Sequence, residues 1–266
     1  MSSRKLKLNE GKTDIILIKG SKRCSIEQEF GELSFGSNVV PLSESICNIG
    51  VTFDTSLSFD KHINNISRDC NFYLRNLHRI KTFLNQDTLL TLIHAMITSR
   101  VDYCNSIFTG LPKKHLKKLQ LILNRAARLI FSVSPRDRIT PYLIKLHWLT
   151  IIPRSEYKIC LIVYKVLKYK QPSYLLDLLK FYESPSMMTL RASDDPFRLV
   201  EPVLVGQLSF GMRSFAYTAP RLINQVPIAI KSLTSLDSFK AKLKSYFFVK
   251  SYDLDQNTVQ IEYHVM

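Results

Sequence analysis

The residues that decide the fold run from Thr88 to Ile130 and read TLLTLIHAMITSRVDYCNSIFTGLPKKHLKKLQLILNRAARLI. In the first half, from Leu89 to Val101, apolar side chains recur near the i, i+3, i+4, i+7 spacing of a half-buried helix. Residues 109–112 (Thr-Gly-Leu-Pro) interrupt the pattern, and Pro112 suits the opening of a new helix. The stretch therefore predicts two apolar-faced helices joined at this break.

The second of these helices sorts its side chains by charge. At about 100° per residue, one broad face holds the apolar residues Leu116, Leu119, Ile122, Leu123, Ala126, Leu129 and Ile130. The opposite face holds the cations Lys114, Lys117, Lys118, Arg125 and Arg128, with Leu121 as the one misfit. No acid occurs between Lys113 and Arg128, whereas a solvated helix usually alternates its charges. The pattern favours a polyanion as the counter-charge; a face that serves only solubility is the alternative.

Composition limits the class of protein. The 266 residues suffice for one large domain or two ordinary ones, and an apolar content of 45% is typical of a globular chain. The net charge of +15 favours nucleic acid or an anionic membrane surface as a partner. No apolar run reaches the roughly 18 residues of a membrane span, and the first residues lack the apolar region of a signal peptide.

The cysteines indicate a reducing compartment. They are odd in number and form no C-x-x-C pair: Cys24, Cys47, Cys70, Cys104 and Cys160. This spacing argues against a disulfide framework and against a zinc knuckle, and the six histidines are too dispersed for a local metal site. We expect reduced thiols, no metal, and an intracellular location, cytoplasmic or nuclear.

The pattern predicts an α+β fold that is mainly α, with a small antiparallel β piece at the N-terminus. Residues 13–18, 33–40 and 46–53 are the expected strands of one sheet of three or four strands. A long helix is expected over 60–83, and Asn85 is the expected N-cap of the next one. The main boundary is placed in the polar linker 132–138.

Beyond that linker the sequence predicts a second, mostly helical region. The expected helices are 140–148, 154–169, 172–181, 212–224 and 236–249, with a single turn at 227–230 and a cap at Thr234 or Ser235. Residues 183–211 are rich in Pro and Ser, and we expect a loop there with one or two short strands.

Several motifs in a fixed order resemble the carboxy-terminal part of a non-LTR retrotransposon reverse transcriptase, of the jockey or chicken-repeat type. The motifs are residues 5–9 with Lys12-Thr13 (L-x-L-N-x-x-K-T), 48–51 with 54–57 (L-G-V-x-x-D-x-x-L), 99–105 (S-R-L-D-Y-C-N), 110–112, 119–120, 124–128, 146–154 (L-H-W-L-P-x-x-x-R), 215–222 and 238–240. Together they cover nearly the whole chain, to about Phe248.

The resemblance implies a domain organisation. Residues 1–57 would be a remnant of the reverse transcriptase palm, 58–133 a thumb-like helical region, 134–250 a C-terminal helical region and 251–266 a tail. In the family the catalytic aspartates precede the residue 5–9 motif, so the chain would be a truncated RNA-directed DNA polymerase fragment without them. We then expect no polymerase activity from the chain alone and no cofactor, because Mg²⁺ belongs to the intact polymerase.

The resemblance also implies partners and contact residues. Similarity to a thumb implies that Arg68, Arg75 and Arg79, together with the cations Lys114 to Arg128, follow the template–primer backbone of RNA or DNA. Lys12 corresponds to a contact with the incoming nucleotide. A protein partner covering the palm-facing surface is a further expectation. The alternative is a helical protein-interaction module without any nucleic-acid function.

The remaining candidates for chemistry favour structural roles. Asp194-Asp195 is the only aspartate pair, but it lacks the flanking strands that would fix two metal ions, so a turn or cap is expected. Asp14, Asp54 and Asp102 are expected as caps or ion-pair partners, and Asp102 lies beside Arg100 in sequence. Three further candidates, Cys104, His94 and Trp148, are expected to be core residues. No catalytic residue is assigned.

Overall fold

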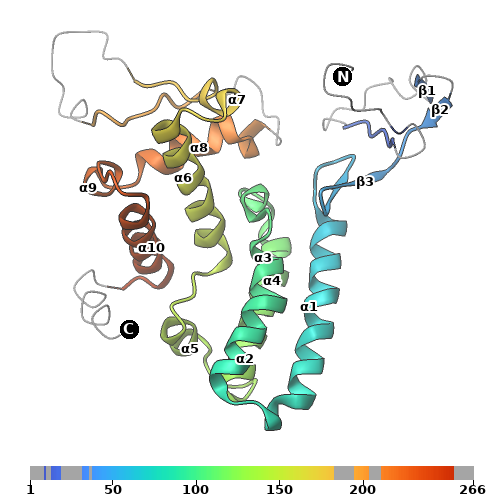
Figure 1. The fold of residues 1–266 in the computed structure, drawn as a ribbon, viewed down its shortest axis with the longest axis vertical. Helices are drawn as coiled ribbons and strands as arrows, with labels where there is room; N and C mark the ends of the chain where they lie inside the picture. The colour runs from blue at the N-terminus through green and yellow to red at the C-terminus, as the bar shows by residue number, and fades with distance from the viewer. Residues whose placement is uncertain are drawn as a thin grey trace. The chain divides into compact units, whose positions relative to one another are not determined.

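A computed structural model describes residues 9, 13–18, 32–35, 38–182, 195–203 and 211–254. As predicted, the fold is mainly helical, with a small antiparallel β portion before the helices (Figure 1). The described residues form two compact units, one ending at Asn65 and the other beginning at Ile66. Within the described ranges, no helix combines the length and apolarity needed to cross a membrane.

The N-terminal unit contains two β-hairpins. Strands β1 (Glu32–Phe35) and β2 (Asn38–Pro41) pair antiparallel, and so do β3 (Ser45–Asn48) and β4 (Val51–Asp54). The prediction of one sheet with strands 33–40 and 46–53 was wrong, because each predicted strand is a hairpin among the described residues. Residues 13–18 are not a strand either; Ile15 makes a single parallel bridge to Leu42.

The turn of the second hairpin explains part of this error. Ile49 and Gly50 have φ angles of 46° and 77°, so both lie in the left-handed region that a two-residue hairpin turn of type I′ requires. Glycine adopts this conformation without strain, but isoleucine rarely does. The Ile-Gly pair therefore reads as a continuing strand, although the chain reverses there.

Asp54 ends β4 and organises the entry into helix α1 (Asp60–Ile80). Its carboxylate accepts hydrogen bonds from the backbone N–H groups of Ser56, Ser58 and Phe59 at 3.1, 2.9 and 2.7 Å. Partial burial alone would raise the pKa of Asp54, but these bonds and those from the two serine hydroxyls together lower it. Asp54 was expected to be a cap or an ion-pair partner; it has a structural role, but its carboxylate holds the turn before α1, because its donors Ser56, Ser58 and Phe59 precede the helix.

The predicted helical region up to residue 131 is confirmed, with one irregularity. Its elements are α1, a 3₁₀ turn (Lys81–Phe83), α2 (Gln86–Ile93), a π-helical turn (His94–Thr98), α3 (Ser99–Asp102), a 3₁₀ turn (Asn105–Phe108) and α4 (Lys113–Phe131). Asn85 caps α2 as predicted, and its side chain accepts from the Thr88 N–H at 2.8 Å. The π-helical turn was not predicted, because the apolar pattern continues through it.

Gly110 makes the break between α3 and α4. Its φ of +77° lies in the left-handed region, and a Cβ placed there would lie 2.9 Å from Cγ of Arg213. Both constraints favour glycine at this position. Pro112 is the N-cap residue of α4, in agreement with the predicted helix start.

The C-terminal helices agree with the predicted order. They are α5 (Thr140–Lys145), α6 (Ile151–Tyr169), α7 (Ser173–Leu176), α8 (Phe215–Asn224), α9 (Ile228–Lys231) and α10 (Leu236–Tyr252), with a 3₁₀ turn at Gly211–Arg213 before α8. Ser235 caps α10 as predicted. In the loop before α8, the described residues include one antiparallel bridge, Phe181 to Leu199; residues 183–194 and 204–210 lie outside the described ranges.

Several of these helices begin or end differently from the prediction: α5 ends three residues early, α8 begins three residues late and α10 ends three residues late. Helix α6 begins three residues early, because Oε1 of Gln120 accepts the Ile151 N–H at 2.9 Å. This bond comes from α4 and supplies a cap that local sequence does not show. Helix α7 ends at Leu176 instead of residue 181. Leu179 is buried, so packing of the apolar side chain takes precedence over helix continuation.

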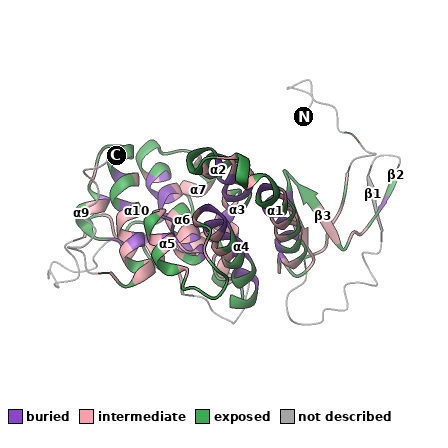
Figure 2. Ribbon diagram, turned by 90° about the horizontal axis from the view of Figure 1, so that it is seen from below, coloured by how far each residue is buried: buried purple, intermediate pink, exposed green. Residues whose placement is uncertain are grey.

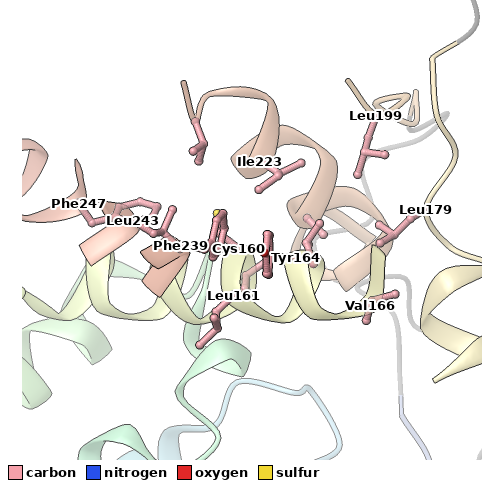
Figure 3. Close-up of a cluster of buried hydrophobic side chains, with 14 of the residues drawn as sticks. Cys160, Leu161, Tyr164, Val166, Leu179, Leu199, Ile223, Phe239, Leu243 and Phe247 are labelled. Atoms are coloured by element: carbon pink, nitrogen blue, oxygen red, sulfur yellow. The ribbon is translucent and has the colours of Figure 1, made fainter. Parts of the chain in front are cut away.

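The C-terminal core forms around α6 (Figures 2 and 3). Cys160 and Val163 of α6 and Phe239 and Leu243 of α10 are completely buried. The ring of Tyr164 stacks on that of Phe239, with centroids 3.8 Å apart and planes 13° from parallel. Apolar burial on this scale is the main stabilising contribution to such a helical region.

Candidate nucleic-acid interface

Helix α4 separates apolar and cationic residues as predicted. All seven apolar residues assigned to its inner face are buried. Lys114, Lys117, Lys118 and Arg125 are exposed, and Arg128 is half-buried. Leu121, the predicted misfit, is 42% exposed among the cations. The sequence-derived face is therefore a real surface of the folded chain.

The start of α4 is electrostatically unfavourable to the helix. Its first turn carries Lys113 and Lys114 and no acid. Because the N-terminal end of a helix has a partial positive charge, lysines at this end lower helix stability by a few tenths of a kcal/mol each. A bound polyanion would offset this repulsion.

Helix α1 contributes a second row of cations. Arg68, Arg75 and Arg79 are exposed. They lie within about 40° of one another on the helix, opposite the buried stripe that includes Cys70 and Leu74. Arg68 is 3.4 Å from the adjacent Asp69 carboxylate, so part of its charge is already balanced.

Contacts between side chains bring the two rows together. Arg125 of α4 donates to Oδ1 of Asn71 of α1 at 2.7 Å, and Lys81 Nζ donates to Oγ of Ser132 at 2.6 Å. The two pairs run in the same sequence direction, so α1 and α4 lie side by side and parallel (Figure 1). Asn71 lies three and four residues from Arg68 and Arg75, on a neighbouring part of the helix surface.

We call the joined rows the basic surface. It consists of Arg68, Arg75 and Arg79 of α1 and Lys114, Lys117, Lys118 and Arg125 of α4. Arg128 lies at its edge and is engaged locally, because it donates to the backbone oxygens of Ser134 (3.4 Å) and Asp137 (3.2 Å). Lys12, the expected nucleotide contact, lies outside the described residues.

Sequence reasoning missed two features of the basic surface. Asn71, which joins the helices, has no recognisable sequence signal. Phe72 is 52% exposed between the arginines of α1, and its ring meets that of Tyr73 edge to face at 5.5 Å. The position of Phe72 on the outer face of α1 was available from the helical period, because it lies opposite Cys70 and Leu74.

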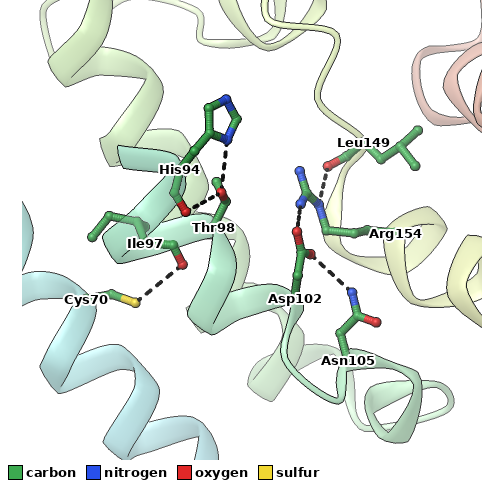
Figure 4. Close-up of polar contacts among 8 residues, drawn as sticks. All are labelled: Cys70, His94, Ile97, Thr98, Asp102, Asn105, Leu149 and Arg154. Carbon is green, nitrogen blue, oxygen red and sulfur yellow. Dashed lines mark hydrogen bonds and ion pairs between the residues drawn. The ribbon is translucent and has the colours of Figure 1, made fainter. Parts of the chain in front are cut away.

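Asp102 pairs with a different arginine from the neighbour suggested by sequence (Figure 4). Its carboxylate is 2.6 Å from the Arg154 guanidinium and also accepts from Nδ2 of Asn105 at 3.2 Å. Arg100 instead donates to the Tyr73 hydroxyl at 3.2 Å and lies over that ring. The predicted structural role of Asp102 is confirmed, but its partner is 52 residues away in sequence.

The other candidates for chemistry have structural contacts. Asp195 forms an ion pair with buried Lys231 and accepts from the Phe197 N–H; Asp194 lies outside the described residues. Trp148 is buried as predicted, and the His94 ring contacts Thr98 and the Trp148 ring. The predicted core positions of His94 and Cys104 were wrong, because His94 is exposed and Cys104 is only partly buried. Among the residues with described positions, no group of three or more His, Cys, Asp or Glu side chains is placed to hold a metal ion.

Burial keeps two cysteines in the thiol form. Desolvation raises the pKa of Cys70 to about 11, and it raises the pKa of Cys160 above its usual range. A protonated thiol is a poor nucleophile, so these two residues act as small core side chains. Cys70 also lies 4.0 Å from the backbone oxygen of Ile97, within the packed interior.

No family model, no curated protein and no solved structure matches the chain.

Proposed function

We propose that the chain binds the sugar–phosphate backbone of RNA or DNA through the basic surface, as the thumb and C-terminal part of a non-LTR retrotransposon reverse transcriptase. The single observation that carries this proposal is the Arg125–Asn71 bond, which joins two rows of exposed cations on parallel helices. Phosphates spaced along a strand can contact successive turns of both helices, whereas a small anion would meet only one or two of these cations.

The ordered motifs support the polymerase part of the proposal. Residues 99–105 and 146–154 are separate motifs, and the ion pair between Asp102 and Arg154 joins them in the fold. Gly110 of the next motif packs against Arg213, just before the motif of residues 215–222. Contacts among motif residues that are distant in sequence are expected if the motifs belong to one structural unit.

The proposed role of the chain is to bind a nucleic-acid strand, without catalysis. Lysine and arginine contacts to phosphate position a strand but do not read its bases, so we expect little sequence preference. No polymerase step and no metal-dependent chemistry is assigned to the described side chains. RNA-directed DNA synthesis belongs to the family that the chain resembles, with Mg²⁺ held by aspartates of the intact polymerase.

A salt titration tests the proposal. The purified chain should bind a fluorescein-labelled RNA–DNA hybrid, and log K should fall linearly with log salt, with about −0.7 to −0.9 of slope per phosphate contact. In a triple variant, Arg75→Gln, Arg79→Gln and Lys114→Gln, affinity at low salt should fall at least about tenfold and the slope should shrink by about 2 to 3.

A matched control separates the basic surface from general charge. Lys165→Gln, Lys180→Gln and Lys242→Gln remove the same charge from exposed positions of the C-terminal region. This variant should keep the wild-type slope to within about one contact. If both triple variants lost the same amount of nucleic-acid affinity, the net charge of +15, and not the basic surface, would be the cause of binding.

A second candidate function is protein binding by this helical region. The observation in its favour is the exposure of large apolar side chains: Phe72 is 52% exposed, Leu121 42% and Phe83 87%. A chain with this function should show little nucleic-acid affinity even at low salt, so the same titration separates the two candidates.

A further inference from the structure

A cleft lies apart from the basic surface, where the π-helical turn, the start of α6 and helix α10 meet. It has a volume of about 260 Å³. Five of its lining side chains can carry a positive charge, namely His94, His147, Arg154, Lys158 and Lys244, and its only carboxylate among the described residues is Asp102. Phosphate groups are commonly bound where several cationic donors converge.

The one carboxylate does not neutralise the cleft. Asp102 is engaged by the guanidinium of Arg154 at 2.6 Å and by the Asn105 amide (Figure 4). Arg154 also donates through Nε to the backbone oxygen of Leu149 at 3.4 Å, so the guanidinium is fixed from two sides. Glu156, the next acid on α6, forms an ion pair with Lys250 at 3.6 Å and does not line the cleft.

The charges in the cleft repel one another. Desolvation is the main cause that lowers the pKa of Lys244, and the positive charge of Arg154 lowers it further. The pKa of His94 is also lowered, first by desolvation and then by Arg154 and Lys244, against the opposing effect of Asp102. An anion bound in the cleft would raise the pKa of both His94 and Lys244, because its negative charge offsets the repulsion from the neighbouring cations.

The wall of the cleft holds a buried acceptor that lacks a donor. The side chain of Asn105 is almost fully buried, and its Oδ1 has no hydrogen-bond partner. The Asn105 amide is oriented by its Nδ2 bond to Asp102, which leaves Oδ1 as the unsatisfied atom. A buried acceptor of this kind costs about 1–3 kcal/mol if nothing satisfies it.

We infer that this cleft is a phosphate-binding site, in which Arg154, Lys158 and Lys244 hold the oxyanion and Oδ1 of Asn105 accepts a hydrogen bond from a P–O–H group of the ligand. Inorganic phosphate, or a terminal phosphate on a nucleic-acid strand, has both the charge and the P–O–H donor that the cleft lacks. The site uses none of the residues of the basic surface, so it stands independently of the proposed function.

The primary test uses the full chain and inorganic phosphate at constant ionic strength. Titration calorimetry should show saturable binding, and the pKa of His94, followed by NMR, should rise when phosphate is bound. The double variant Lys158→Gln with Lys244→Gln should weaken phosphate binding by about tenfold or more, because two charge-assisted contacts are lost. The His94 signal is identified with His94→Gln.

The control variant removes the same amount of positive charge from the same two helices, α6 and α10, but at positions outside the cleft. Lys165→Gln with Lys242→Gln changes exposed lysines of α6 and α10 outside the cleft, and phosphate affinity should stay within about twofold. The inference is overturned if phosphate fails to shift the pKa of His94 in the wild type, or if both double variants lose affinity equally. Circular dichroism melting confirms that each variant is folded.

Two sources of the phosphate are then distinguished. A 5′-phosphorylated oligonucleotide and the same strand with a 5′-hydroxyl are compared in wild type and in the Lys158→Gln, Lys244→Gln variant. A preference for the phosphorylated end that disappears in the variant assigns the site to strand ends. Equal binding of both strands, together with the calorimetric signal for inorganic phosphate, assigns it to a free phosphate or a small phosphorylated molecule.

Discussion

The cations of α4 and those of α10 have different neighbours, although the two helices have similar lengths. Lys240 and Lys250 of α10 form ion pairs with Asp237 (3.1 Å) and Glu156 (3.6 Å). On α4, Arg125 and Arg128 contact neutral amide and carbonyl oxygens, and Lys114 is exposed in a first turn without acids. Lys240 and Lys250 of α10 are therefore paired with carboxylates, whereas Arg125 and Arg128 of α4 contact neutral oxygens that do not balance their positive charge.

The aromatic residues of α1 and α10 also differ in their exposure to solvent. Phe239 and Phe247 of α10 are fully buried, and Phe239 stacks on Tyr164. Phe72 of α1 lies exposed between arginines. A large apolar ring stabilises the fold only when it is removed from water. The C-terminal region therefore uses its aromatic side chains for stability, and the basic surface presents one to the solvent.

The largest expected effect is on the buried ring. Phe239→Ala should lower the free energy of unfolding of the helical unit by about 3–5 kcal/mol, because it leaves a cavity and removes the stacking on Tyr164. Phe83→Ala, at an 87% exposed position, should change it by less than about 0.5 kcal/mol. Urea unfolding followed by circular dichroism measures both. Similar values for the two variants would mean that the C-terminal core is not the stabilising part.

A smaller effect is expected from the exposed ring. If Phe72 stacks on an unpaired base, Phe72→Ala should weaken the binding of single-stranded RNA by about 1–2 kcal/mol and leave duplex binding nearly unchanged. Phe83→Ala, outside the arginine row, is the control. Fluorescence anisotropy with single- and double-stranded probes gives the comparison. An equal loss for both probes would show that Phe72 supports α1 and does not contact bases.

The smallest expected effect is on local stability before α1, at Asp54. Because the folded pKa of Asp54 lies below its unfolded value, its stabilising contribution is present above about pH 4 and is lost as the pH falls through the folded value. Asp54→Asn should therefore reduce the protection of the Phe59 amide by about 0.5–1 kcal/mol at neutral pH. The difference from wild type should shrink as the pH falls through the folded pKa of Asp54.

Hydrogen exchange read by NMR measures this change, with protection compared to the intrinsic exchange rate at each pH. Asp177→Asn, after α7, is a matched control at an exposed position. A difference between Asp54→Asn and wild type that persists unchanged at low pH would contradict the assigned role of the carboxylate.

The helices, their faces and the presence of a small antiparallel β portion were predictable from the sequence, but the strand bounds and pairing were not. The 3.6-residue period identified α1 and α4 and separated the cations of α4 from Leu119 and Ile122. The hairpins were missed because a turn at Ile49-Gly50 depends on backbone angles that isoleucine seldom adopts. A short strand has only the two-residue period to mark it, and residues 46–53 satisfy that period on both sides of the turn.

The candidate sites were also only partly predictable from the sequence. The basic residues of α1 and α4 were assigned from local pattern, but the bond between Arg125 and Asn71 that joins them was not. The phosphate cleft could not be predicted at all, because His94, Arg154 and Lys244 come from three separate parts of the chain. Nothing in the local sequence around any one of them indicates the other two.

By itself, the sequence determined the helical periods, the segregation of charge on α4 and the strong positive charge of the chain. These properties depend on residues within a few turns of one another. The tertiary structure alone decided that Asp102 pairs with Arg154 and not with Arg100, that Gln120 caps α6, and that three cations converge on one cleft. Such contacts depend on how the buried faces pack, and packing brings together residues whose separation along the chain carries no local signal.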